Sequence, residues 1–220
     1  MNKVATDIPS AVADVGDGAS ILVGGFGGAG APTALLEELA GRDLHDLTVI
    51  ANNAGTGTTG LAALLASGAA SRIICSYPRM RGSEIFEKLY SEGSIELELC
   101  PQGTLSERIR AAGAGIAGFY TRVAADTDLA AGRETRVIDG RLHVLETPLA
   151  ADFALIRADT ADRWGNLTYR KAARNFGPTM AMAGRVTVAE TDRIVPLGDI
   201  DPELVVTPGI FVQRVVEVPS

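Results

Sequence analysis

The sequence predicts a single open α/β/α domain over residues 1–220, with a mainly parallel mixed sheet and one β-hairpin excursion. Three observations favour this fold. Short apolar strand patterns alternate with helix patterns through the first half of the chain. The helix patterns there begin and end near Pro, Ser and Gly residues. In the second half, Asp139-Gly140 joins two alternating runs, which is a strong hairpin signal.

The first half contains four strand patterns, each followed by a helix pattern. The predicted strands are 20–23, 47–51, 72–76 and 95–99, and the predicted helices are 32–40, 60–66, 83–92 and 104–112. Pro32 favours a helix start and Gly41 a helix stop. The strand at 95–99 alternates apolar and acidic residues, so it is expected at an edge. Thr104 and Glu107 have the spacing of a capping box, which predicts that the last helix begins there.

The second half contains fewer helix patterns. It is predicted to contain the hairpin over 135–146 and strands at 153–158, 185–189 and 210–218. Residues 122–132 give weak signals and are expected to form a loop or a short helix. No low-complexity linker or internal repeat is visible, which favours one domain.

The composition is that of an ordinary globular protein. With 220 residues, 46% of them hydrophobic, the chain can bury a full core. The net charge of −7 argues against nucleic acid as a partner. Two Cys residues suit a reducing compartment. Because no signal peptide and no long apolar run are visible, we expect no membrane partner and a cytoplasmic location.

A glycine-rich segment follows the first strand and precedes the first helix. It consists of Gly24, Gly25, Phe26, Gly27, Gly28, Ala29 and Gly30. A backbone without side chains can approach a ligand closely, and the following helix N-terminus could attract a phosphate or another anion. A tight turn that merely packs well is about equally compatible with this pattern. The spacing G-x-G-x-x-G is present, but no acidic residue follows the second strand, and there is no Walker lysine.

Amide side chains are expected at the same edge of the sheet. Asn52 and Asn53 follow the second strand, and Gln102 follows the fourth. Ligands bind beyond the carboxyl ends of strands in open α/β sheets, and amides there can donate to a carbonyl or carboxylate oxygen. Taken alone, the Asn motif is more typical of a turn, and a lone Gln is more typical of a solvated side chain.

The chain offers little else for catalysis. Its one basic cluster consists of Arg163, Arg170, Lys171 and Arg174, which could receive an anion or an acidic partner surface. No metal site and no Ser-His-Asp triad is predicted, because His45 and His143 are isolated. Cys75 and Cys100 lack a His neighbour in sequence. Several donors for anions and oxyanions without a nucleophile or base indicate half of an active site.

Taken in order, these motifs resemble the A (alpha) subunit of class I CoA-transferases, the 3-oxoacid CoA-transferase family. The resemblance covers nearly the whole chain. It rests on Gly24-Gly25-Phe26 with Gly30 and Pro32, Asn52-Asn53-Ala54-Gly55, Pro101-Gln102-Gly103-Thr104-Leu105, Asp162-Arg163 with Gly165-Asn166, and Ala173-Arg174-Asn175-Phe176. The segment Trp164 to Tyr169 and the segment Thr207 to Val216 are similar to the family branch that acts on 3-oxoadipate. Arg122 to Thr127 departs from the family pattern, which leaves that loop's conformation and substrate contacts open.

The resemblance implies an enzyme that moves CoA from succinyl-CoA to a 3-oxo acid. In this family a glutamate of the B half attacks the thioester and forms a glutamyl-CoA thioester. The implied partner is a separate B subunit in an A2B2 heterotetramer, and CoA thioesters are substrates, with no cofactor. Asn52, Asn53 and Gln102 are expected to donate to thioester or anhydride oxygens, and the glycine-rich segment is expected to bind CoA.

Two other functions remain open. An alpha chain that serves acetoacetate or another 3-oxo acid would carry the same motifs. A non-catalytic nucleotide- or sugar-phosphate-binding module could use the same kind of sheet.

Overall fold

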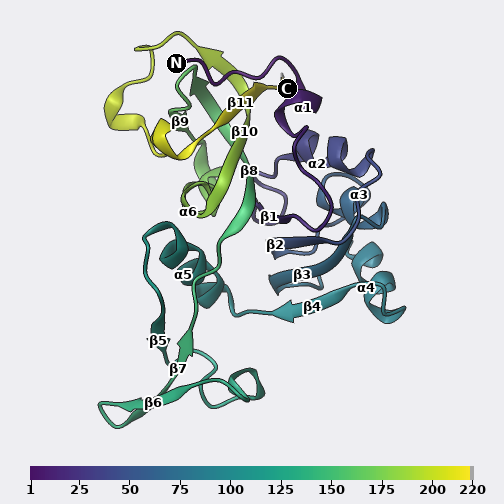
Figure 1. Cartoon of the computed structure of the whole chain (residues 1–220), viewed down its shortest axis with the longest axis vertical. Helices are drawn as coiled ribbons and strands as arrows, with labels where there is room; N and C mark the ends of the chain where they lie inside the picture. The colour runs from purple at the N-terminus through teal and green to yellow at the C-terminus, as the bar shows by residue number, and fades with distance from the viewer. Residues whose placement is uncertain (219–220) are drawn as a thin grey trace.

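A computed structural model describes residues 1–218, and its centre is a parallel sheet of strands from both halves of the chain (Figure 1). Its strands are β1 Ser20–Val23, β2 Leu47–Asn53, β3 Ala70–Tyr77, β4 Glu96–Leu99, β8 Ala151–Asp162, β9 Leu167–Thr168, β10 Gly184–Val195 and β11 Arg214–Glu217. The order is β11-β10-β8-β1-β2-β3-β4, with neighbours parallel, and β9 pairs antiparallel with β8. Strand β4 lies at the edge, as its alternating sequence predicts.

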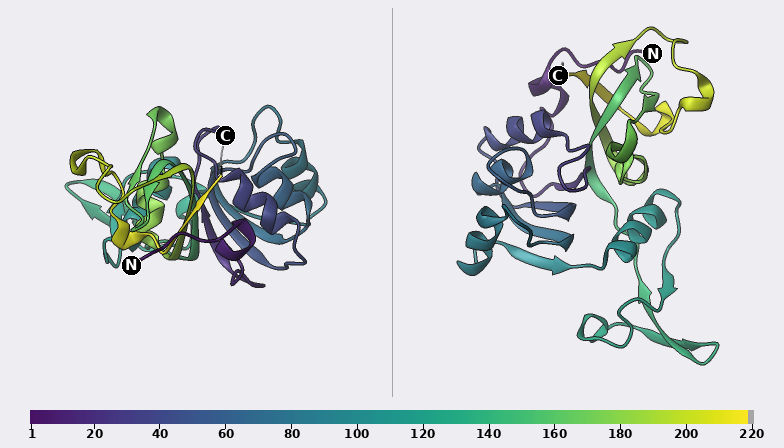
Figure 2. Two further views of the ribbon diagram at one scale, coloured as in Figure 1. Left: turned by 90° about the horizontal axis from the view of Figure 1, so that it is seen from above. Right: turned by 180° about the vertical axis from the view of Figure 1, so that it is seen from behind.

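Helices cover both faces of this sheet (Figures 1 and 2). They are α1 Ile8–Ala11, α2 Thr33–Ala40, α3 Leu61–Ala66, α4 Glu84–Ser91, α5 Gln102–Gly113 and α6 Gly177–Ala183. Because side chains alternate along a strand, Ile21 and Val23 pack in the core under α1 to α4, whereas Leu22 packs in the core under α5 and α6. The predicted open α/β/α fold with a mainly parallel sheet is therefore confirmed.

The hairpin excursion is a separate three-stranded antiparallel sheet that projects away from the main sheet in Figures 1 and 2. It contains β5 Phe119–Thr121, β6 Thr135–Ile138 and β7 Arg141–Glu146 in the order β5-β7-β6. Asp139 and Gly140 have φ values of 50° and 72°, as a type I′ hairpin turn requires. The sequence-based prediction of a hairpin at this place is confirmed.

Ion pairs connect the small sheet to the main one. Glu146 at the end of β7 is almost completely buried and accepts hydrogen bonds from Arg133. The Arg108 Nε atom of α5 lies 3.7 Å from Glu146, and its Nη1 atom donates to Glu98 of β4 at 2.9 Å. Because Glu146 is buried, its charge depends on these two arginines, and removing both would leave it uncompensated.

Several elements differ from the prediction: β8 and β10 are longer than expected, and α1 and α6 are not predicted. Helix α5 begins at Gln102 after Pro101, two residues before the capping-box pattern, and Pro101 provides no side-chain cap. Thr104 lies inside the helix, buried, and its Oγ1 atom has no hydrogen-bond partner among the described residues. At the end of the chain only Arg214–Glu217 forms a strand, because Gly209–Phe211 is a 3₁₀ turn. Among residues 1–218, no helix has the length and apolar composition needed to cross a membrane.

Candidate active site

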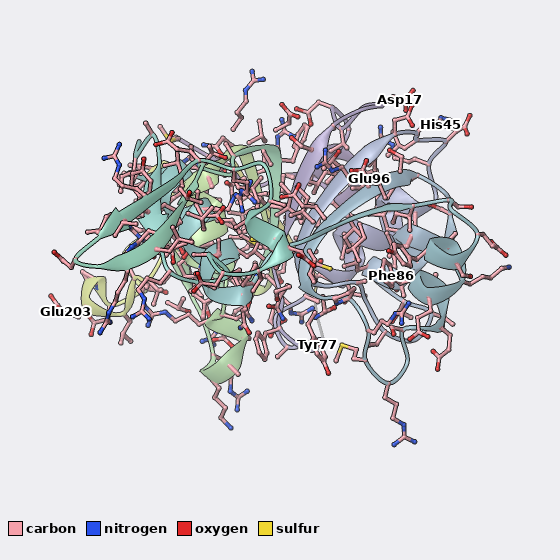
Figure 3. The ribbon with its side chains drawn as sticks, turned by 90° about the horizontal axis from the view of Figure 1, so that it is seen from below. Asp17, His45, Tyr77, Phe86, Glu96 and Glu203 are labelled. Atoms are coloured by element: carbon pink, nitrogen blue, oxygen red, sulfur yellow. The ribbon has the colours of Figure 1, made fainter. Side chains whose placement is uncertain are left out.

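The carboxyl ends of the parallel strands gather the predicted site residues at one edge of the sheet. Figure 3 shows Tyr77, the last residue of β3, on the opposite side of the molecule from Asp17 and His45 at the other edge. At the carboxyl edge, β1 and β2 end beside a cleft of about 200 Å³. Its lining includes Gly24, Gly25, Gly28, Asn52 and Asn53. The glycine-rich segment and the two asparagines therefore come together as the sequence predicts.

Both asparagines are held with their amide groups available as donors. Asn52 is only 6% exposed, and its Oδ1 atom accepts a hydrogen bond of 2.9 Å from the Ser76 hydroxyl of β3. The Oδ1 atom of Asn53 accepts a bond of 2.9 Å from the Gly55 backbone N–H. Within residues 1–218, neither Nδ2 group donates a hydrogen bond to the protein. Their carbonyl oxygens are fixed by the protein, so a ligand oxygen is the natural acceptor for the NH2 groups.

The glycine-rich segment forms a tight turn beside this cleft. Phe26 and Ala29 exchange backbone hydrogen bonds of 3.0 and 3.1 Å around Gly27 and Gly28. Gly30 has a φ of 69°, and a Cβ atom there would lie 2.4 Å from the carbonyl oxygen of Ala173. No other residue fits Gly30 without moving backbone, because both the φ value and the close approach exclude a side chain.

Three backbone N–H groups of the turn make no hydrogen bond within the described residues. In the described part of the chain, the amides of Gly27, Gly28 and Gly30 donate to no protein acceptor. Gly27 and Gly28 are exposed. The turn thus offers backbone donors of the kind that bind an anion or a polarised oxygen.

The backbone N–H groups at the start of α2 are not free to bind a ligand. The backbone N–H groups of Ala34 and Leu35 donate to the Glu190 carboxylate at 3.0 and 3.2 Å. Glu190 is fully buried in β10 and also accepts from the Arg157 Nη1 atom at 2.9 Å. Burial raises the pKa of Glu190, although these hydrogen bonds and the Arg157 charge act in the opposite direction. The expectation that a ligand anion binds at this helix start is therefore wrong, because an internal carboxylate already lies there.

Gln102 lies in a second depression, of about 400 Å³. That depression is lined by residues of the glycine-rich segment, α5, α6 and the turn before α6. They are Phe26, Gln102, Gly103, Ser106, Asn175, Phe176 and Thr179. Gln102 is exposed, and its side chain makes no hydrogen bond within residues 1–218. The structure thus places Gln102 across the glycine-rich segment from the asparagines and not in their cleft.

The predicted basic cluster is divided. Arg170 and Lys171 line a third depression together with Ala29, Arg157 and Asp192. Arg163 lies instead in the turn between β8 and β9, where its carbonyl accepts from the backbone N–H of Lys3. Arg157, which sequence reasoning passed over, is already paired with Glu190 and Asp192. Only part of the cluster therefore borders the glycine-rich segment.

Nucleophiles are scarce at this edge. No residue lining the asparagine cleft has an ionisable side chain in the described structure. Burial raises the pKa of Cys75 to about 12 and raises that of Cys100, so both thiols stay protonated. His45 is exposed at the other edge of the sheet, near Asp17 and Asp43. No group of three His, Cys, Asp or Glu side chains suited to a metal occurs among residues 1–218.

Two residues that shape the site have no site role predicted from the sequence, although Asn175 belongs to one of the family motifs. Glu190 directly follows the predicted strand 185–189, and an acidic residue there, between Ala189 and Thr191, is the signal that could have revealed it. Asn175 accepts a hydrogen bond from the Gly25 N–H at 3.1 Å and donates to the Ala29 carbonyl at 2.9 Å. Nothing local to Asn175 indicates these contacts, since Gly25 lies 150 residues away.

The sequence is similar to those of several named proteins over almost the whole chain. The A subunit of 3-oxoadipate CoA-transferase from Pseudomonas putida is 57% identical over 218 residues, covering 99% of this chain and 94% of its own. The protein of the same name from Acinetobacter baylyi is 53% identical, covering 100% and 96%. The A subunit of succinyl-CoA:3-ketoacid coenzyme A transferase from Xanthomonas campestris is 49% identical, covering 98% and 92%.

Solved structures have the same fold. A variant of the decarboxylase AibA/AibB superposes with a TM-score of 0.84 at 25% identity, covering 100% of this chain and 84% of its own. Glutaconate coenzyme A-transferase from Acidaminococcus fermentans gives a TM-score of 0.83 at 21% identity, covering 99% and 76%. The family model described as coenzyme A transferase matches residues 5–218. This chain is therefore a member of the coenzyme A transferase family.

Proposed function

We propose that the chain is the A subunit of a CoA-transferase that moves CoA from succinyl-CoA to 3-oxoadipate. The observation that carries this proposal is the 57% identity to the corresponding chain of the Pseudomonas putida 3-oxoadipate CoA-transferase over 99% of this chain. The similarity falls to 49% for the Xanthomonas campestris relative named for 3-ketoacids. An A subunit for acetoacetate or another 3-oxo acid is the second candidate, and that relative is what favours it.

The catalytic glutamate belongs, in this proposal, to a separate B subunit. The glutamate carboxylate attacks the thioester carbonyl carbon of succinyl-CoA and expels the CoA thiolate, which gives a succinyl-glutamyl anhydride. The thiolate then attacks the glutamyl carbonyl carbon and releases succinate, so that CoA is held as a glutamyl-CoA thioester. The carboxylate of 3-oxoadipate takes up CoA by the same two steps in reverse. The asparagine cleft supports a donor role for this chain because it contains amide and backbone donors and no ionisable side chain. The assembly is an A2B2 heterotetramer in the cytoplasm, with CoA thioesters as substrates and no cofactor.

Each site residue has a defined part in the proposed reaction. The Nδ2 groups of Asn52 and Asn53 donate to the oxygen that becomes negative when the carbonyl is attacked. The open N–H groups of the glycine-rich segment contact CoA or the acyl end, close to the backbone. Gln102 approaches from the neighbouring depression and makes its contact once substrate is bound.

The test is to purify this chain by itself, the B subunit by itself, and the two together. Each preparation is assayed with succinyl-CoA and either 3-oxoadipate or acetoacetate. We expect transfer only by the two chains together, with the higher kcat/KM for 3-oxoadipate. Transfer by this chain alone would overturn the half-site proposal, and a preference for acetoacetate would favour the second candidate.

A further inference from the structure

Asn175 connects a distant segment to the glycine-rich segment. It lies between the 3₁₀ turn Lys171–Arg174 and α6, yet its side chain contacts residues that follow β1. Its Oδ1 atom accepts from the N–H of Gly25 at 3.1 Å and of Phe176 at 2.7 Å. Its Nδ2 group donates to the carbonyls of Ala29 and Ala172, both at 2.9 Å.

These four bonds use the whole hydrogen-bonding capacity of the side chain. A carboxamide has two N–H donors and an oxygen with two lone pairs, and each has a backbone partner here. Although Asn175 lines the depression that contains Gln102, it has no polar group left for a substrate. Any effect of Asn175 on the reaction must therefore act through the backbone that it holds.

That backbone separates the two depressions. Gly24, Gly25 and Gly28 line the asparagine cleft, whereas Phe26 lines the depression with Gln102. Asn175 holds the turn at both ends, at Gly25 and at Ala29, across the Phe26 to Ala29 hydrogen bonds. A change in the path of this turn would alter both depressions together.

We infer that Asn175 is a positioning residue of the active site, which fixes the glycine-rich segment between the asparagine cleft and Gln102. This inference rests on the proposed function, because it assigns the segment to substrate binding. Only a carboxamide can make all four of these hydrogen bonds. An aspartate keeps the acceptors but would place a carboxylate against two carbonyl oxygens. A displacement of about 1 Å at a reacting centre can lower the rate about 10²-fold.

The experiment compares Asn175→Ala and the isosteric Asn175→Asp in the complex with the B subunit. Backbone hydrogen exchange over 24–31 and steady-state kinetics are measured for both. Asn2→Ala is the matched control, because Asn2 is exposed and accepts one local bond from Val4. We expect faster exchange confined to 24–31 and a fall in kcat of about 10²-fold for Asn175→Ala, with a smaller change in KM.

Asn175→Asp is expected to raise exchange over 24–31 and lower kcat as well, because its carboxylate would lie against the Ala29 and Ala172 carbonyl oxygens, and it provides the test if Asn175→Ala fails to fold. Unchanged exchange over 24–31 in the variants would overturn the inference, as would faster exchange with unchanged turnover. If the unaltered complex transfers CoA to neither 3-oxoadipate nor acetoacetate, the proposed function is wrong. The exchange measurement then still decides whether Asn175 fixes the segment.

Discussion

The two depressions on either side of the glycine-rich segment are built differently. In the asparagine cleft, the Asn52 and Asn53 side chains are anchored through their oxygens, and the start of α2 is satisfied by the Glu190 carboxylate. In the other depression, α5 begins at Gln102, the preceding Pro101 provides no side-chain cap, and the Gln102 side chain is exposed and makes no hydrogen bond within the described residues. Donors held in place before substrate arrives contribute most to catalysis, so the comparison assigns the larger role to the asparagine cleft.

The strongest test of this difference is Asn52→Ala in the complex with the B subunit. Loss of one preorganised donor should lower kcat by about 10²–10³-fold. The matched control is Ser76→Ala, which removes the bond that anchors Asn52 and leaves the Nδ2 donor present. We expect a clearly smaller loss for Ser76→Ala in the same steady-state assay. Equal losses in the two variants would mean that packing, and not donation, explains the effect.

Gly30→Ala tests whether the path of the glycine-rich segment, which separates the two depressions, matters for activity. Its new Cβ atom would lie 2.4 Å from the Ala173 carbonyl oxygen, so the turn must move, and we expect kcat/KM to fall by about 10²-fold. Gly57→Ala is the control, because Gly57 has a similar φ of 68° and open space where its Cβ would be. The control isolates the cost of backbone strain. A similar loss of activity in both variants would argue against a specific role for the position of the glycine-rich segment.

A smaller effect is expected for Gln102→Ala. Because nothing in the described structure holds its side chain before substrate binds, we expect a loss of kcat of no more than about tenfold, against about 10²–10³-fold for a held donor. The kinetics are measured beside those of Asn52→Ala under the same conditions. A loss as large as that of Asn52→Ala would break the comparison and place Gln102 among the principal donors.

The smallest expected effect concerns Glu190, which accepts hydrogen bonds from the first turn of α2, next to the asparagine cleft. Its raised pKa means that the folded protein holds the proton more tightly than the unfolded chain. The stability that this proton contributes is complete below the unfolded pKa and is lost as the pH rises through the folded pKa.

Glu190→Gln should remove that loss, which is at most about 1.4 kcal/mol per pH unit for one group. Denaturant unfolding is followed from mildly acidic to neutral pH, with Glu203→Gln, an exposed residue, as control. Parallel pH profiles for the unaltered protein and Glu190→Gln would contradict the prediction.

Local sequence patterns predict much of the fold and part of the site. Most strands and helices, the Asp139-Gly140 hairpin and the meeting of the glycine-rich segment with Asn52 follow from periodicity and from the rule for strand ends. The start of α5 is predicted wrongly because a capping-box pattern also occurs inside a helix, where Thr104 is buried. The contacts of Glu190 with α2 and of Asn175 with the glycine-rich segment join residues more than 140 positions apart, which no local pattern encodes.

The central position of β1 determines when this site can exist during synthesis. Strand β1 pairs with β8, and its glycine-rich segment is held by Asn175, so the first half of the chain contains the asparagines but not their finished cleft. Contacts of such high sequence separation form late, because the intervening chain must first be ordered. A nascent chain of residues 1–150 therefore contains Asn52 and Asn53 with their anchors Ser76 and Gly55, but it lacks β8 and Asn175, which hold β1 and the glycine-rich segment. The finished cleft is expected only after residues 151–175 have also been synthesised.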